Sequence, residues 1–194
     1  MNAVELLTGV GQLYIAPVGT TFPLLTATPS SPWVSFGETQ DGVKVATSIK
    51  FEELRVDQRS GPVKAVPTEE DLTIETKLAL ATLENQGYAL GVTVTDTPPA
   101  AGVIGTRAIS LHRGASATEY ALLFRGSQMS PYGATYPAQY EVPRGYISAV
   151  GAFEHKRNAN VQVAITFKAL ESLTALAGEE FGRLIVQDAA ALEA

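Results

Sequence analysis

The chain has 194 residues, of which 45% are hydrophobic and 18% are charged, and its net charge is −6. This composition is typical of a globular domain with a full core and excludes a disordered chain. The absence of cysteine excludes disulfides, thiolate metal sites and cysteine nucleophiles. The excess of acidic residues argues against a duplex-DNA reader, because such proteins bind phosphates through a basic face.

Alternation of apolar and polar residues, with Gly and Pro between the runs, predicts a mainly β chain. In chain order we expect strands at 11–16, 33–36, 43–47, 49–56, 70–80, 106–113, 119–127, 138–142, 146–154, 161–170 and 183–187. The spacing in 81–90 becomes helical and predicts one short helix that ends at Gly91. We further predict a hairpin turn at Gln40–Gly42 and a loop at 91–105.

We see no boundary within the chain, and we predict a single domain over 1–194. Residues 1–10 are expected to form an N-terminal arm, and residues 171–194 a C-terminal extension. The start of the chain carries Glu5 and no basic segment, so we expect no secretory signal. No apolar run approaches the roughly 20 residues of a membrane span, so no membrane association is expected.

Residues that could support catalysis are scattered. The two histidines, His112 and His155, lie in separate segments without the spacing of a zinc site, so no metal or cofactor is expected. Carboxylates cluster at Glu52–Glu53 and Glu69–Asp71, but neighbours on a strand point to opposite faces. We favour a solvated charged surface and no enzyme. A glycoside hydrolase that uses Glu52 or Glu69 is the catalytic alternative.

Tyrosines are concentrated between residues 131 and 146, beside three prolines. Such a cluster fits a carbohydrate or protein contact patch, because tyrosine supplies rigid amphipathic area. It fits equally well a loop packed by its own aromatic side chains. Both interpretations remain open from the sequence. Trp33, between Pro32 and Val34, is more consistent with a core position.

Several segments resemble the tail tube (major tail) proteins of long-tailed bacteriophages. The segments that carry the resemblance are Gly-Gln-Leu-Tyr-Ile-Ala-Pro and its loop at 11–23, Trp33–Gly37, Val56–Gln58 followed by Gly61–Pro62, and the strand 70–80 running into Thr82–Asn85. The resemblance is densest over 11–90; beyond that, the order of elements matches better than the residues. It implies a β-barrel or sandwich with one short α-helix on its flank.

The resemblance also implies a function. Six copies would form a ring, and stacked rings would form a tube through which DNA passes without specific binding. The implied partners are further copies of the chain, a tape-measure protein and other tail proteins. The implied location is the virion tail, assembled in the cytoplasm of the host bacterium.

The implied tube assembly suggests candidate residues for the contacts between subunits and for the lumen wall. The strand 49–56 carries charge on both faces, which suits a hairpin at about 37–67 that projects and packs on a neighbouring subunit. The candidate inter-subunit contacts are Tyr14, Phe51, Glu53, Arg55, Asp57, Tyr132, Tyr136 and Tyr140. The candidate lumen face is Asp71, Thr73, Glu75 and Lys77, because an acidic or neutral wall would let DNA slide.

Two alternatives to a tail tube protein remain. One is a different tail component of related fold, such as a terminator or baseplate ring. The other is a carbohydrate-binding β-sandwich that uses the tyrosine-rich segment.

Overall fold

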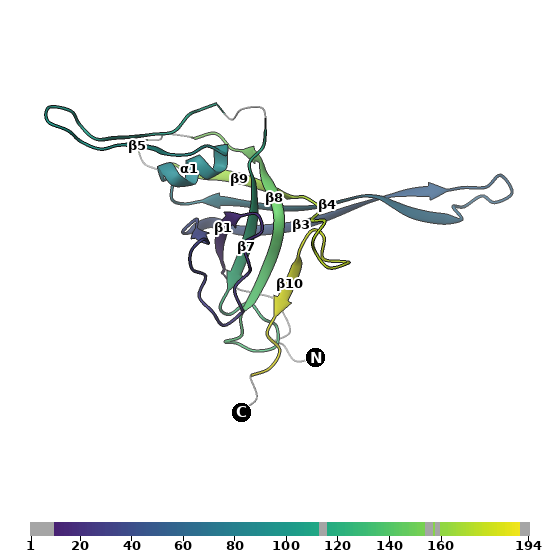
Figure 1. Cartoon of the computed structure of the whole chain (residues 1–194). Coiled ribbons are helices and arrows are strands. Elements are labelled where there is room, and N and C mark those ends of the chain that lie inside the picture. Colours follow the sequence, from purple (N-terminus) through teal and green to yellow (C-terminus); the bar gives the residue numbers. More distant parts are fainter. Residues whose placement is uncertain (1–9, 113–115, 154–156, 158–159, 191–194) are drawn as a thin grey trace.

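The computed structural model describes residues 10–112, 116–153, 157 and 160–190, and within them it is mainly β with one helix (Figure 1). The elements are β1 Gln12–Pro17, β2 Val34–Ser35, β3 Thr39–Leu54, β4 Lys64–Leu78, α1 Leu83–Leu90, β5 Thr95–Thr97, β6 Thr106–Ala108, β7 Glu119–Gly126, β8 Ala138–Val150, β9 Val163–Ala169 and β10 Arg183–Val186. The predicted mainly β fold with one short helix on its flank is confirmed. Most of the predicted arm 1–10 lies outside the described residues.

One eight-stranded antiparallel sheet organises the chain, with strand order β2-β1-β7-β8-β9-β4-β3 and β10 added on β8. Strand β8 is long and curved, and its two halves have different partners on one edge. Its beginning, from Ala138 to Glu141, pairs with β10, and its end, from Gly145 to Val150, pairs with β9. The sheet therefore splits at β8 into two layers, and among the described strands its two ends, β2 and β3, remain unpaired with each other.

The core lies between these two layers. Leu13 and Ile15 of β1 and Phe124 of β7 belong to the same buried cluster as Ile74 of β4 and Phe167 of β9. Alternate residues of β9 are buried, as the period of two in the sequence predicted. A second, smaller cluster surrounds Trp33, which is buried as predicted, and the Trp33 ring packs 5.1 Å from that of Phe22.

The predicted turn at Asp41–Gly42 is wrong. Both residues have positive φ, 64° and 77°, as in a turn, but they form a bulge inside β3, and the strand continues beyond them against β4. The separately predicted strands 43–47 and 49–56 are consequently one strand, β3. A tight turn and a bulge use the same backbone conformation, so the residues alone do not distinguish them.

Three other predictions need correction. The strands expected at 138–142 and 146–154 are one strand, β8, because Pro143 and Gly145 bend the strand without ending it. The expected strand 106–113 is only β6, and the expected loop 91–105 contains its partner β5. These two form a hairpin that leaves the body on the side opposite the β3–β4 hairpin.

Helix α1 follows the local signals. The Thr82 hydroxyl accepts a hydrogen bond from the Asn85 N–H at 3.2 Å, and Gly91 ends the helix in the left-handed conformation with φ of 69°. The Asn85 side chain is buried and its Nδ2 donates to the carbonyls of Phe36, at 3.0 Å, and Leu80, at 2.8 Å. One side chain thus ties the helix to the segments on either side of the β3–β4 hairpin.

Asn85→Ala should lower the free energy of unfolding by about 1–3 kcal/mol, because the buried Phe36 carbonyl and the partly buried Leu80 carbonyl lose their donor. Equilibrium denaturation followed by the fluorescence of Trp33, the single tryptophan, measures the change. Asn160→Ala, at an exposed position, is the matched control and should shift stability by less than about 0.5 kcal/mol. Equal effects of the two substitutions would contradict the anchoring role of Asn85.

Glu119→Gln should destabilise the domain by less than about 1 kcal/mol at neutral pH. Arg144 Nε donates to one oxygen of Glu119 at 2.7 Å and Nη2 to the other at 2.9 Å, and these hydrogen bonds hold the pKa of Glu119 below its ordinary 4.5. A depressed carboxylate pKa stabilises the fold above the ordinary value, and the benefit is lost as pH falls through the depressed pKa. Denaturation of both proteins from pH 7 downward should therefore show the difference shrinking; a difference constant with pH would contradict the ion pair.

Candidate assembly surfaces

The β3–β4 hairpin extends far beyond the body of the domain (Figure 1). Within the body, one face of β3 and β4 belongs to the core, with Val45 opposite Ile74. Because side chains alternate along a strand, Ile49 and Phe51 lie on this same face of β3, beyond the point where the core covers it. Their side chains are 49% and 59% exposed. The hairpin therefore presents a continuation of the core face, which we call the apolar face, to solvent.

The end of the hairpin adds further exposed apolar groups, which are Leu54, Val56, Val63 and Val66. Three of the other predicted contact residues lie there too. Glu53 and Arg55 form an exposed ion pair at 2.9 Å, and Asp57 is exposed in the connecting turn. Four of the eight predicted contact residues, including Phe51, are thus grouped on one projecting element.

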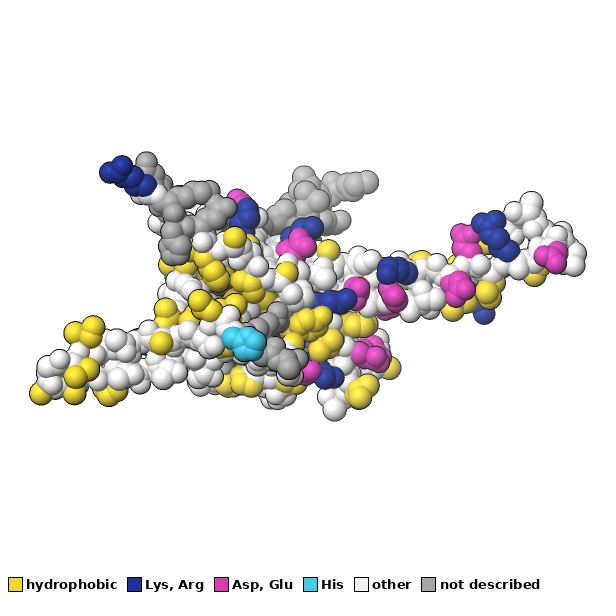
Figure 2. All heavy atoms as spheres, turned by 90° about the horizontal axis from the view of Figure 1, so that it is seen from above, with side chains coloured by type: hydrophobic (Ala, Val, Ile, Leu, Met, Phe, Trp, Pro, Cys, Tyr) yellow, Lys and Arg dark blue, Asp and Glu magenta, His cyan; other side chains and the backbone are white. Residues whose placement is uncertain are grey.

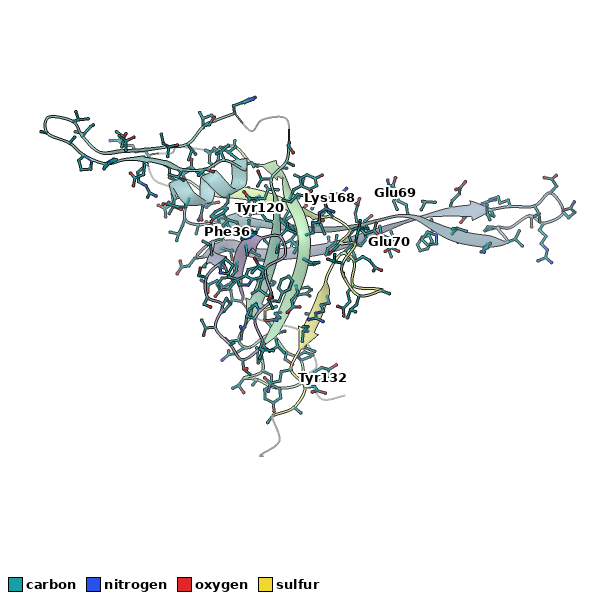
Figure 3. All side chains as sticks on the ribbon, in the orientation of Figure 1. Phe36, Glu69, Glu70, Tyr120, Tyr132 and Lys168 are labelled. Carbon is teal, nitrogen blue, oxygen red and sulfur yellow. The ribbon has the colours of Figure 1, made fainter. Side chains whose placement is uncertain are left out.

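The remaining four predicted contact residues lie elsewhere. Tyr132 is 58% exposed at the end of the body away from the hairpin (Figure 3). Tyr136 is half-buried in the same loop, and its backbone N–H bonds the Gly133 carbonyl at 3.1 Å. Tyr140 stacks on Phe124 with ring centres 6.0 Å apart, and the Tyr14 hydroxyl bonds Gln12 at 2.7 Å. Two of the four therefore pack within the body, and Tyr132 is the most available for contact.

The opposite face of the same two strands is polar. Asp71, Thr73, Glu75 and Lys77 do lie together on one face of β4, because Leu72, Ile74 and Leu78 alternate with them toward the core. Thr73 donates a hydrogen bond to the Ala46 carbonyl of β3 at 3.4 Å. We call this surface, with the adjoining residues of β3 and β9, the charged face.

The charged face is neutral overall, because four cations each pair with one carboxylate. The pairs are Lys44–Glu75 at 3.1 Å, Lys77–Asp41 at 2.8 Å, Lys168–Asp71 at 2.8 Å and Lys50–Glu69. Figure 2 shows the two signs of charge interspersed along the hairpin. The hydrogen bond to Asp71 raises the pKa of Lys168, and the hydrogen bond to Glu69 raises the pKa of Lys50.

Sequence reasoning identified the acidic members of this face on β4 but missed their basic partners, Lys44, Lys50 and Lys168. The missing signal was the strand register. Glu75 lies directly opposite Lys44, and Asp71 lies diagonally across from Lys168, which is opposite Thr73. Lys44 and Lys50 are an even number of residues apart and therefore lie on the same face of β3, and this spacing was the pattern available in the sequence.

No group of histidines and carboxylates placed to hold a metal ion occurs in the described part of the chain. Within the same residues, no helix has the length and apolar character needed to cross a membrane. His112 is exposed, whereas His155 lies outside the described residues. Glu52 and Glu69, the candidates for a hydrolase, are both exposed on the projecting hairpin, and Glu69 is paired with Lys50.

Comparison with known proteins identifies the chain at the level of the family. A search of curated proteins finds none that matches it. A family model described as phage tail tube protein matches residues 1–192, which is nearly the whole chain. The mainly β fold with a single helix agrees with that match, as does the resemblance found in residues 11–90. The chain belongs to the phage tail tube protein family and is a structural protein of the virion tail.

Proposed function

We propose that this chain assembles with copies of itself into stacked rings, and that the resulting tube conducts DNA during ejection. The observation that carries the proposal is the apolar face of the β3–β4 hairpin, where Ile49 and Phe51 continue the core face into solvent. Monomeric proteins rarely expose such a surface unless it binds a partner. In a tube, the neighbouring copy of the chain would be the partner that covers this apolar face.

The proposed contacts are head-to-tail: the hairpin of one copy meets a different surface of its neighbour. Repeating such a contact closes a ring if the rotation closes and extends a filament if it does not. Strand β3 also has a free edge, since among the described strands it pairs with β4 alone. A free edge offers backbone groups for pairing with a neighbouring sheet. The family resemblance favours six copies in a ring.

The proposed lumen surface is the charged face. Its four ion pairs leave no net charge to attract the phosphate backbone. A basic wall would bind DNA by releasing its counterions, whereas a wall of paired charges gives no such gain. DNA would therefore slide past these side chains without being held.

The remaining parts of the proposal follow from the family. Assembly would take place in the host cytoplasm on a tape-measure protein, and other tail proteins would bind the ends of the tube. Tyr132, exposed at the end of the body away from the hairpin, is the tyrosine best placed for such contacts.

Negative-stain electron microscopy of the purified protein tests the proposal directly. Long tubes with a central channel are expected. Isolated rings would favour a terminator or baseplate ring instead, and small particles at every concentration would contradict self-assembly. Glycan binding by such particles would favour the carbohydrate-binding alternative.

Phe51→Ser should raise the concentration needed for tube formation by about tenfold or more, because an apolar contact at the subunit interface is lost. The fold itself should be nearly unaffected, within about 0.5 kcal/mol, since the Phe51 side chain is 59% exposed. Sedimentation combined with microscopy measures assembly. Leu24→Ser, at an exposed leucine outside the hairpin, is the matched control; tubes from Phe51→Ser at the wild-type concentration would contradict the contact.

Asp71→Lys combined with Glu75→Lys should slow DNA release and make the rate depend more strongly on salt, since two negative charges become positive. Dye fluorescence during triggered ejection from phage particles carrying the variant measures the rate. Lys44→Glu combined with Lys168→Glu is the control, because it breaks the same two ion pairs with the opposite charge. Slow release only in the lysine variant supports the lumen assignment, and equal rates in both variants would reject it.

A further inference from the structure

The β5–β6 hairpin forms a second arm, which leaves the body on the side opposite the β3–β4 hairpin (Figure 1). Three residue pairs join its strands, from Thr95–Ala108 to Thr97–Thr106, and a bridge between Ala100 and Val103 closes its tip. Gly102 supplies the turn with φ of 74°. Both strands are exposed along their whole length, and Arg107 of β6 links the base of the arm to helix α1 through an ion pair with Glu84 at 2.6 Å.

The tip of this arm, residues 98–105, is Pro-Pro-Ala-Ala-Gly-Val-Ile-Gly and contains no charged or hydrogen-bonding side chain. Val103 and Ile104 are 58% and 81% exposed. Figure 2 shows hydrophobic side chains and no charge at the end of this arm, in contrast to the β3–β4 hairpin. A short two-stranded hairpin is marginally stable alone in water, so an exposed apolar tip on one needs a surface to bind.

A groove of about 440 Å³ lies on the other side of the molecule, at the base of the β3–β4 hairpin. It is the open end between the two layers of the sheet, bounded by β3 on one side and by β10 on the other. Its apolar lining includes Val45, Ile49, Leu72, Val142, Phe181 and Leu184. Ile49 belongs to the apolar face of the hairpin, so the groove and that face form one continuous surface.

We propose that the tip of the β5–β6 hairpin of one copy occupies this groove in the next copy around the ring. The inference rests on the proposed self-assembly and names the two surfaces that meet. The β5–β6 hairpin leaves the body on the side opposite the β3–β4 hairpin, whose base lines the groove (Figure 1). A copy therefore cannot fill its own groove, and each copy offers one tip and one groove. Such a contact is heterologous, and repeating it closes a ring when the rotation between copies closes.

The uncharged tip is chemically complementary to the groove. The groove is also lined by acidic groups, including Glu70 and the buried Glu141, and Arg183 Nε donates a hydrogen bond to the Glu141 carboxylate at 2.7 Å. An uncharged tip enters between them without burying a charge, whereas the other arm, with its lysines and glutamates, would bury several. Strands β3 and β10 each have one edge without a described partner strand, so the backbone of the incoming tip also finds hydrogen-bonding groups there.

Cysteine cross-linking tests the contact, because the chain has no cysteine of its own. In assembled tubes, Ile104→Cys combined with Leu184→Cys should give a ladder of covalent oligomers with bis-maleimide reagents of increasing length. A chain with one cysteine can form nothing larger than a dimer. A ladder from the double variant, with no dimers from Ile104→Cys or Leu184→Cys alone, therefore requires the head-to-tail contact. Ile104→Cys combined with Leu173→Cys, at an exposed leucine outside the groove, is the matched control and should give no ladder.

The outcomes separate the two proposals. A ladder confined to the Ile104–Leu184 pair supports the docking of the tip in the groove. Tubes without a ladder for any reagent would overturn this inference and leave the tube assembly intact. Dimers from Ile104→Cys alone would show that two tips meet each other, which also overturns it. If the double variant and the wild type both fail to form tubes, the proposed assembly itself fails.

Discussion

The structure depends on one constraint: strand β3 has a core-forming face that is longer than the core. Near the body, Val45 packs against the core, but Ile49 and Phe51 carry the same face beyond it. Fully burying an apolar side chain stabilises a protein by roughly 1.5–3 kcal/mol, and Ile49 and Phe51, which are 49% and 59% exposed, realise only part of this gain in a single copy. The exposed face therefore favours association with another chain, and the proposed functions of the hairpin and of the groove both follow from it.

The same two strands serve a second purpose on their other face. Strand pairing brings each lysine beside a carboxylate, so the surface is strongly polar and yet carries no net charge. Exposed ion pairs of this kind add little to stability. Their physical consequence is electrostatic: a surface of paired charges has a weak field at a distance and neither attracts nor strongly repels a polyanion. The overall negative charge of −6 is distributed elsewhere on the chain.

The β3–β4 hairpin and the β5–β6 hairpin differ in the residues that they expose. The β3–β4 hairpin combines apolar and charged residues and pairs at fourteen positions, with two register shifts along its length. The β5–β6 hairpin is short, and its tip is entirely uncharged. An arm that is charged along its length remains soluble before assembly, whereas an apolar tip is suited to a groove that excludes water.

The sequence by itself determined the mainly β class, the helix that ends at Gly91, the alternating core residues of β9, and the family to which segments 11–90 point. These features depend on local periodicity and on backbone conformations that few residues adopt. Only the tertiary structure decided that Asp41–Gly42 is a bulge, that β5 and β6 form an arm, and which lysine faces which carboxylate. Those features depend on strand register, which joins residues far apart in the chain and which no single segment encodes.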